Sequence, residues 1–365
     1  MGGPEAKGLS GFLSVDDYLV YGPGEGILRT LAESGFSLPG GIYDSSAPPL
    51  SALPFPYKTA DKPRLQNKLV YYETSRGCPF RCIYCLSAED NRREQRFSAS
   101  SLADRHRLYG ELDKLVALQP RTIKFVDRSF NLDRALCHLI WNYAIKAENA
   151  CEFHFEIYPD LLSDEDILLL EQAPPGRIRF EIGIQTINAA VSRRCRRNSN
   201  WHKAKAMIHA LRTRSNICLH TDLLAGLPGE NYRSILHSLD ELALLLPHEI
   251  QLGMLKILPD TPMLDIARMR GYKWMEQPPY QILCSDALSF EQVTRLQELA
   301  RILNLYWNKE EFSSEWALLL GEGHKASVLL NMLLSRHHKL SLPLHSISKQ
   351  HRREIFSQVF PQVLI

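Results

Sequence analysis

The sequence predicts an α/β fold, a partial (β/α)6 TIM-like barrel followed by a helical extension. Between residues 68 and 271, six apolar, strand-like stretches alternate with stretches in which apolar residues recur at helical spacing. Strand-then-helix units in series favour a parallel sheet with right-handed crossovers. Residues 272–365 show mainly helical patterns. Because barrels of this kind carry their chemistry at the carboxyl ends of the strands, the residues after each strand are the first candidates for a site.

The composition is that of an ordinary globular protein. The chain has 365 residues, 45% of them hydrophobic and 23% charged, enough for one large domain with appendages or for two domains. The formal net charge of +2 argues neither for nor against nucleic acid. Eight cysteines are too few for a disulfide scaffold, the first residues lack the apolar core of a signal peptide, and no run of 18 apolar residues occurs. We therefore expect a cytoplasmic protein without a membrane span.

Two segments precede the predicted core. Residues 1–45 predict a strand from Val15 to Val20, a glycine-rich turn and a helix from Ile27 to Glu33, with too little apolar surface to fold independently. Residues 46–67 hold five prolines among Ser, Ala and Lys, a composition typical of an extended linker. We place the domain boundary in this linker, so the core is expected to span residues 68–271 and the helical extension residues 272–365.

The predicted core strands are apolar runs with aromatic and β-branched residues. They are expected at residues 68–74, 122–127, 151–157, 178–184, 217–224 and 250–258. Helical patterns separate them, including one continuous pattern over residues 188–214. Capping boxes mark two helix starts, Ser163 with Asp166 in the core and Ser289 with Gln292 in the extension. Further helices are predicted near residues 314–336 and 343–360.

Three cysteines stand directly after the first core strand. Cys78, Cys82 and Cys85 have C-x-x-x-C-x-x-C spacing, on a loop at the carboxyl end of the strand. Three thiolates can hold one face of a metal site, whereas a closed structural zinc site or a four-cysteine iron–sulfur cluster needs a fourth ligand. The missing ligand leaves one metal open to a substrate. The alternatives are a zinc knuckle completed by a distant Cys or His, and three unrelated core cysteines.

This motif, with Arg76-Gly77 before the first cysteine and Tyr84 before the last, resembles the radical S-adenosylmethionine (radical SAM) enzymes. The resemblance implies that Cys78, Cys82 and Cys85 bind a [4Fe-4S] cluster whose fourth iron is chelated by SAM. It also implies that an electron passed into the SAM sulfonium yields a 5′-deoxyadenosyl radical. A reducing partner such as flavodoxin or ferredoxin is then expected.

The resemblance extends to residues after the later strands. Asp127 ends the second strand, where many radical SAM enzymes carry Gly-Gly-Glu that binds the SAM amino group. The segment from Glu181 to Arg197 is similar to oxygen-independent coproporphyrinogen oxidase and its relatives. By this similarity, the SAM-contacting positions are Glu156, Gln185, Arg197 and Asp222. The alternatives are hydrogen-bonded strand ends for the acidic and amide residues and, for Arg197, one more charge in an arginine-rich helix end.

The amino-terminal segment resembles the last part of a cobalamin-binding domain. The resemblance is carried by Gly2-Gly3-Pro4 and by the turn Gly24-Glu25-Gly26, so residues 1–45 are interpreted as a remnant of such a domain, and a truncated gene model would explain it. The Asp-x-His-x-x-Gly signature that supplies a cobalt ligand in many such domains is absent from the sequence. Its absence weighs against cobalamin binding by this chain alone.

The expected function is therefore that of a cobalamin-linked radical SAM enzyme. Methyl or related group transfer to an unknown substrate is the commonest chemistry of that subfamily. The alternatives are a cobalamin-independent radical SAM oxidoreductase and a zinc-stabilised RNA-binding protein. Basic clusters at residues 193–197, 336–339 and 351–353 suggest nucleic acid, but solvated helix faces are the commoner explanation of such runs. The histidines include no H-E-x-x-H pair.

Overall fold

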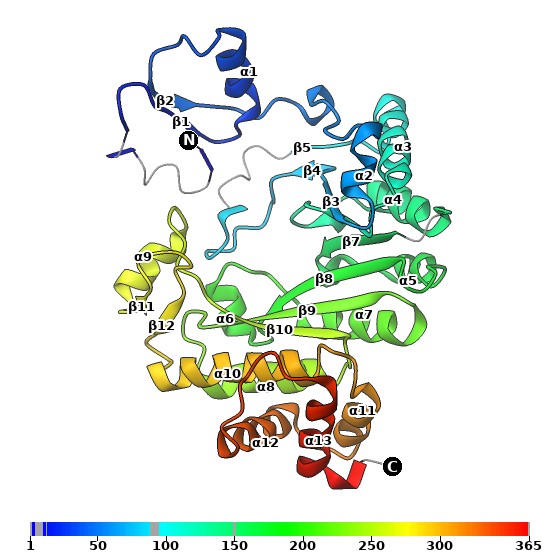
Figure 1. Cartoon of the computed structure of the whole chain (residues 1–365), viewed down its shortest axis with the longest axis vertical. Coiled ribbons are helices and arrows are strands. Elements are labelled where there is room, and N and C mark those ends of the chain that lie inside the picture. Colours follow the sequence, from blue (N-terminus) through cyan, green and yellow to red (C-terminus); the bar gives the residue numbers. More distant parts are fainter. Residues whose placement is uncertain (1, 4–9, 12, 88–94, 149–150, 364–365) are drawn as a thin grey trace.

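A parallel sheet of six strands forms the centre of the protein (Figure 1). The computed structural model describes residues 2–3, 10–11, 13–87, 95–148 and 151–363. The strand order is β10-β9-β8-β7-β6-β3, so neighbours in the sheet are successive in this part of the chain. The strands are β3 (Leu69–Tyr72), β6 (Thr122–Phe125), β7 (Glu152–Ile157), β8 (Ile178–Gln185), β9 (Cys218–Ala225) and β10 (Glu249–Met254). The predicted α/β fold with a partial TIM-like barrel is confirmed.

Helices connect the strands and cover one face of the sheet. They are α3 (Leu102–Ala117), α4 (Arg134–Lys146), α5 (Asp164–Leu170), α6 (Ala189–Arg194), α7 (Trp201–Arg214) and α8 (Tyr232–Ala243), and a further helix, α9 (Pro262–Met269), follows the last strand of the sheet. The capping box of Ser163 and Asp166 is present at the start of α5. The prediction of one helix over residues 188–214 is wrong. The chain leaves the helix at Arg196, which has φ 53°, and Asn200 caps a second helix by accepting a hydrogen bond from the Lys203 N–H.

The two faces of the sheet differ in polarity. Along β7, buried residues alternate with partly exposed ones, so that Phe153 and Phe155 point to the helices while His154 and Glu156 point to the other face. Strands β8 and β9 show the same alternation. Because side chains alternate across a strand, the apolar positions form the core against the helices and the charged positions share the inner face of the partial barrel.

The amino-terminal segment forms a small β-α-β unit. Strand β1 (Tyr18–Tyr21) pairs in parallel with β2 (Gly41–Asp44), and α1 (Glu25–Glu33) connects them. Glu25, at the start of α1, forms an ion pair of 2.8 Å with Arg76, two residues before Cys78. The unit is therefore joined by charge to the cysteine loop.

The proline-rich segment lies on the core and contains short helical turns. These are η2 (Leu50–Ala52), η3 (Thr59–Asp61) and α2 (Lys62–Leu65). Arg107 of α3 donates hydrogen bonds to the carbonyl groups of Ser51 and Leu53, and Gln95 accepts one from the Leu50 N–H. The predicted linker is thus a strap held by side chains of the core.

Side chains satisfy the backbone at both edges of the sheet. At the β3 edge, the Tyr57 hydroxyl donates to the Tyr71 carbonyl (2.8 Å) and accepts from the Tyr71 N–H (3.0 Å). At the β10 edge, the Asn308 amide donates to the Ile250 carbonyl (3.0 Å) and accepts from the Ile250 N–H (2.9 Å). Each side chain imitates one rung of a further strand, which protects an edge that would otherwise be open to pairing.

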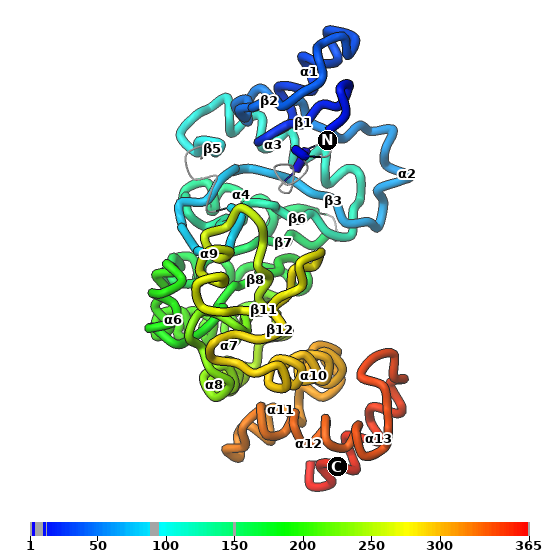
Figure 2. The backbone as a smooth tube through the Cα atoms, turned by 90° about the vertical axis from the view of Figure 1, so that its left-hand side faces the viewer, coloured from blue at the N-terminus to red at the C-terminus, as the bar shows by residue number. Residues whose placement is uncertain are grey.

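The helical extension lies at the end of the molecule opposite the amino-terminal unit (Figure 2). After the short hairpin β11 (Lys273–Trp274) and β12 (Ile282–Cys284) it contains α10 (Phe290–Tyr306), α11 (Ser313–Gly321), α12 (Ala326–Lys339) and α13 (Lys349–Val359). The predicted capping box of Ser289 and Gln292 opens α10, which packs along β10. Among the described residues, no helix is long and apolar enough to cross a membrane.

The pairing of Asn308 with β10 gives a stability prediction. We expect Asn308→Asp to lower the free energy of unfolding by about 1–3 kcal/mol, because a carboxylate has the same shape but cannot donate to the Ile250 carbonyl. Urea unfolding at pH 7 measures the change. Asn304→Asp, at an exposed position of α10 four residues before Asn308, is the control and should have little effect. Equal losses in both variants would contradict the role given to Asn308.

Candidate active site

The cysteine loop leaves the sheet after β3 and is closed by a short antiparallel pair. Strand β4 (Ser75–Arg76) pairs with β5 (Gln95–Arg96), so the segment between them, which includes the three cysteines, forms one excursion above the carboxyl end of the sheet. Two backbone hydrogen bonds fix its middle: the Ile83 N–H donates to the Cys195 carbonyl (3.1 Å), and the Ile83 carbonyl accepts from the Met263 N–H (2.9 Å). The loop is therefore anchored to the ends of α6 and α9.

The three cysteines face one cavity of about 200 Å³. Cys78 and Cys82 are buried and Cys85 is half-buried. The Cys78 sulfur lies 3.7 Å from the Ser129 hydroxyl, on the segment after β6. Burial is the main reason why the pKa of Cys78 is raised. A positive metal centre beside the thiol would oppose this shift, since a metal ligand must be a thiolate.

Four of the five predicted SAM-contacting residues line the same cavity. Glu156, Gln185 and Asp222 come from the carboxyl-terminal halves of β7, β8 and β9, and Arg197 comes from the turn after α6. The cavity is completed by Phe80, Tyr84, Ser87, Arg128, Ser129, Ile157, Tyr158, Glu181 and Gly183. Positions that are far apart in the sequence thus surround the cysteines, as the barrel topology predicts.

Asp127, the fifth predicted residue, is absent from the described lining of this cavity. It is 1% exposed, and both its carboxylate oxygens accept hydrogen bonds from the start of the cysteine loop. One oxygen accepts from the Thr74 N–H (3.0 Å), and the other accepts from the hydroxyls of Thr74 (2.7 Å) and Ser75 (2.6 Å). This geometry fixes the turn that leads into the loop, and it does not support the predicted contact of Asp127 with SAM.

Arg197 is held in a stack of rings. The rings of Phe80 and Tyr158 are stacked with centroids 4.5 Å apart, and the guanidinium carbon of Arg197 lies 4.5 Å from the Tyr158 centroid. Arg197 also donates to the Gly183 carbonyl. Among the described residues, its Nε atom and the Tyr84 hydroxyl are buried without a hydrogen-bond partner. Two such polar atoms beside one cavity suit a polar ligand, because an unsatisfied buried donor is costly.

Gln185 reaches the cavity through an irregularity of β8. The register between β8 and β9 shifts at Gly183 and Gln185, and Gln185 has φ 67°, in the left-handed region. A side chain on Gly183 would lie 2.6 Å from the Gln185 amide nitrogen. The bulge therefore directs Gln185 into the cavity, and a glycine at position 183 leaves room for it.

Three carboxylates line the inner side of the cavity. Burial, followed by the neighbouring Glu181, raises the pKa of Glu156. Glu181 itself accepts a hydrogen bond from His154 (3.0 Å) and another from Lys124 (2.8 Å), and the first of these is the main reason why its pKa falls to about 2. Asp222 lies opposite Gly183 in the sheet. The carboxylates of Glu156 and Asp222 are thus left as acceptors toward a ligand.

Sequence reasoning missed Glu181, Phe80 and Tyr158. The alternation of apolar and polar residues along Ile178–Gln185 contained a signal for Glu181, because it places that residue on the same face as Gln185. No comparable signal existed for the ring stack, since Phe80 and Tyr158 meet only through the fold.

Several arginines of the basic clusters make contacts within the protein. Arg197 lines the cavity, and Arg194 donates to the Pro228 carbonyl. Arg352, in the last cluster, is buried and forms a two-point ion pair with Glu311 (2.5 and 3.1 Å). These contacts weaken the interpretation of the clusters as a nucleic-acid surface, which would need charges gathered on one free face.

Comparison with family models identifies two parts of the chain. Residues 72–242 match the model of the radical SAM superfamily, and residues 270–358 match a model described as a protein of unknown function, DUF4080. Residues 72–242 are thus a radical SAM domain, the catalytic domain of a class of enzymes that use a [4Fe-4S] cluster and SAM. No curated protein matches the chain.

One solved structure has a similar fold over nearly the whole chain. The cobalamin-dependent SAM radical enzyme OxsB is similar over 98% of this chain and 60% of its own, with 14% identity and a TM-score of 0.59. The radical SAM methyltransferase TsrM from Kitasatospora setae is similar over 56% of this chain and 39% of its own, with 19% identity and a TM-score of 0.47. The chain therefore spans less than two thirds of the length of either protein.

The residues around the cavity fit the cofactors that the domain implies. The thiols of Cys78, Cys82 and Cys85 are free. Among the described residues, no three His, Cys, Asp or Glu side chains are placed to hold a single metal ion. A [4Fe-4S] cluster makes a different demand, because each thiolate binds a separate iron. The unpaired donors of Arg197 and Tyr84 and the acceptors of Glu156 and Asp222 suit the zwitterionic amino acid part and the hydroxyls of SAM.

Glu230 supports the β8 end of the site and gives a pH prediction. Its carboxyl group accepts hydrogen bonds from Thr186 (2.5 Å) and Ser234 (3.2 Å), and burial raises its pKa to about 7. The folded protein then binds a proton that the unfolded chain releases near pH 4.5. Stability from this group is present below pH 4.5 and is lost as the pH rises through about 7.

The free energy of unfolding of the wild type should fall between pH 5 and pH 8, whereas that of Glu230→Gln lacks this contribution. We therefore expect the difference between the variant and the wild type to increase by on the order of 2 kcal/mol from pH 5 to pH 8, in favour of the variant. Urea unfolding at both pH values measures this difference. Glu165→Gln, whose side chain is 76% exposed, is the control. Parallel pH profiles of wild type and Glu230→Gln would contradict the raised pKa.

Proposed function

We propose that this protein is a radical SAM enzyme that transfers a methyl or related carbon group to a substrate still to be identified. In this proposal Cys78, Cys82 and Cys85 bind the [4Fe-4S] cluster. Glu156, Gln185, Arg197 and Asp222 bind SAM. The observation that carries the proposal is the convergence of these seven residues on one cavity at the carboxyl end of the sheet.

Each side chain has a separate task. The Arg197 guanidinium, held against Tyr158, offers its Nε–H to a carboxylate, for which a planar guanidinium is well suited. Glu156 and Asp222 accept from hydroxyl or ammonium groups, and Gln185 can do either. Phe80 and Tyr158 cover the cavity with aromatic surface and exclude water. When bound, the cluster and SAM supply the radical chemistry, and the protein supplies orientation and a dry site.

Group transfer is supported by the amino-terminal unit. A second cavity, of about 670 Å³, lies between this unit and the cysteine loop, with Tyr21, Glu25, Arg76 and Arg128 in its lining. It shares Arg128 and Ser87 with the cysteine cavity, so the two are adjacent. The fold similarity to OxsB covers the amino-terminal unit as well. We propose this second cavity as the place for cobalamin or for the substrate.

A cobalamin-independent radical SAM oxidoreductase is the second candidate. It is favoured by the absence of the Asp-x-His-x-x-Gly signature from the sequence. Mixing the reconstituted protein with hydroxocobalamin, followed by gel filtration, separates the two: co-elution of the corrinoid absorbance supports group transfer, and its absence favours the oxidoreductase. In both cases we expect flavodoxin or ferredoxin as the electron donor and the reducing cytoplasm as the location, because all eight cysteines are free thiols.

Anaerobic reconstitution tests the radical SAM activity. We expect about four irons per chain and, after reduction with dithionite and addition of SAM, release of 5′-deoxyadenosine. Changing Cys78, Cys82 and Cys85 together to Ala should abolish both the iron and the product. Cys284→Ala, at a cysteine outside the cavity, should retain both. Bound zinc in place of iron, without SAM cleavage by the folded wild type, would exclude the proposal and favour a zinc-stabilised binding protein.

Arg197→Lys tests the SAM site separately. We expect the iron content to stay unchanged and the affinity for SAM to fall about tenfold or more, because an ammonium group offers a point charge in place of a planar fork. Equilibrium dialysis with labelled SAM measures the dissociation constant. Arg193→Lys, at an exposed position four residues earlier, should bind SAM like the wild type. An unchanged affinity in Arg197→Lys would remove Arg197 from the site.

A further inference from the structure

Three carboxylates and one imidazole stand side by side across the inner face of the sheet. Glu156, Glu181, His220 and Glu249 are direct neighbours in register on β7, β8, β9 and β10. Like charges at directly opposite positions destabilise a sheet. A row with three acidic groups therefore needs positive charge, and His220 is the member of the row that can supply it.

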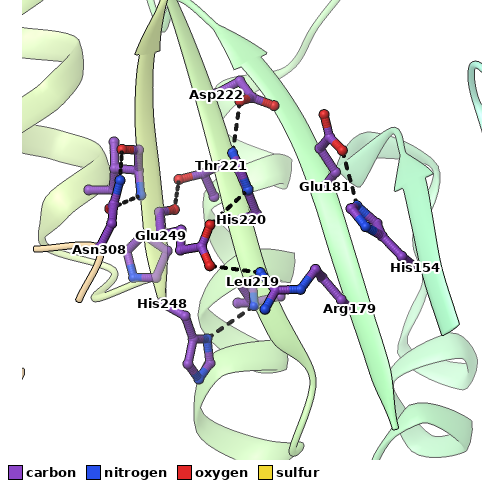
Figure 3. Close-up of polar contacts among 12 residues, drawn as sticks. His154, Arg179, Glu181, Leu219, His220, Thr221, Asp222, His248, Glu249 and Asn308 are labelled. Carbon is purple, nitrogen blue, oxygen red and sulfur yellow. Dashed lines mark hydrogen bonds and ion pairs between the residues drawn. The ribbon is translucent and has the colours of Figure 1, made fainter. Parts of the chain in front are cut away.

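Both ring nitrogens of His220 face carboxylates. Nδ1 lies 3.1 Å from Glu249 Oε2, and Nε2 lies 3.2 Å from Asp222 Oδ1, as Figure 3 shows. A neutral imidazole has one donor and one acceptor nitrogen, and the acceptor would repel its carboxylate. Two carboxylates within ion-pair distance therefore favour the imidazolium form, in which both nitrogens are protonated, although Nε2 and Asp222 Oδ1 do not meet the geometry of a hydrogen bond.

The charges around His220 agree with this form. Burial lowers the pKa of His220, but Asp222 and Glu249 outweigh burial and raise the pKa to about 10. Glu249 also binds Arg179 (2.8 Å), and this carboxylate has its pKa lowered to about 2, chiefly by His220. On the other neighbouring strand, Glu181 has its own partners in His154 and Lys124. The charge of His220 is thus directed to Asp222 and Glu249.

A series of ion pairs connects the amino end of the sheet with the cavity. Glu152 binds Arg179 (3.1 Å), Arg179 binds Glu249 (2.8 Å), Glu249 binds His220 (3.1 Å) and His220 binds Asp222 (3.2 Å). Of these five residues, Asp222 lies in the lining of the cysteine cavity. The series of ion pairs therefore ends at the carboxylate of Asp222, which a ligand in the cavity can contact.

We infer that His220 is a positioning residue, an imidazolium whose charge orients the carboxylate of Asp222 toward the cysteine cavity. Glu249 and Arg179 position His220 in turn. The inference rests on the proposed function in that the ligand which meets Asp222 is SAM. A carboxylate can only accept, so the ligand group that it meets is an ammonium or a hydroxyl. His220 acts through Asp222 and does not exchange a proton near pH 7.

Nuclear magnetic resonance of histidine-labelled, cofactor-free protein tests the imidazolium directly. We expect the His220 signals, identified by their loss in His220→Gln, to show two protonated ring nitrogens from pH 6 to pH 9. In Asp222→Asn the midpoint of titration should fall by about one pH unit or more, since one of two carboxylate partners loses its charge. A midpoint near that of a free histidine, or no response to Asp222→Asn, would overturn the inference.

Binding of SAM to the reconstituted protein tests the positioning role. We expect His220→Gln to weaken SAM binding about tenfold and Glu249→Gln to weaken it less, with unchanged iron content. His138→Gln is the matched control, because His138 also binds a carboxylate, Asp166 at 2.5 Å, but on α4 and α5 outside the sheet. SAM binding that survives in His220→Gln but fails in Arg197→Lys would overturn the positioning role and leave the proposed function intact.

A failure of the proposed function and a failure of the inference about His220 give different results. A wild-type protein that carries the cluster but binds no SAM would contradict the proposed function and, with it, the positioning of SAM by Asp222. The resonance experiment does not depend on SAM and would still decide whether His220 is an imidazolium. If His220→Gln does not fold, Glu249→Gln provides both measurements from the other end of the contact with His220, because Glu249 lies outside the cavity lining.

Discussion

The pairing of charges across the inner face of the sheet is the constraint on which the rest of the structure depends. The outer face is largely apolar and packs on helices, so the inner face receives the charged residues of the alternating strands. Glu156 and Glu181 are directly opposite each other, an arrangement that is unfavourable without compensation. Lys124 and His154 provide it. Burying such pairs contributes little net stability, but it fixes which groups stay ionised beside the cavity.

The parts of the fold that depend on local patterns could be predicted from the sequence. Strand periodicity, the capping boxes of Ser163 and Ser289 and the position of the cysteines after the first core strand are all encoded in neighbouring residues. The break between α6 and α7 was missed although residues 196–200 include no apolar residue, and its deciding features are the backbone at Arg196 and the cap by Asn200. The hydrogen bonds between side chains and the backbone of the edge strands could not be predicted either, since Asn308 and Ile250 are 58 positions apart.

In the candidate site, too, some features could be predicted from the sequence and others depend on contacts made only in the folded protein. Topology alone brings strand ends together, so Glu156, Gln185 and Asp222 could be expected near the cysteines. Which strand-end carboxylate faces the cavity depends on hydrogen bonds that no local pattern records. Asp127 follows β6 as Glu156 ends β7, yet Thr74 and Ser75 engage both its oxygens and turn it toward the loop backbone. The burial of Asp127 is therefore a consequence of forming the loop. Glu156 has only distant partners, Lys124 at 3.9 Å and Arg128 at 4.0 Å, and it stays exposed to the cavity.

The cavity is lined by fixed charges of both signs, which in the proposed site would divide the recognition of a zwitterion between them. Arg197, stacked on Tyr158 and bonded to the Gly183 carbonyl, presents a cation that cannot be deprotonated. Asp222, which lies opposite Gly183 in the sheet, presents a carboxylate to the same cavity. Because both charges are held by partners within the protein, little reorganisation is needed when a ligand enters, and such preorganisation is what makes electrostatic binding effective in a dry site.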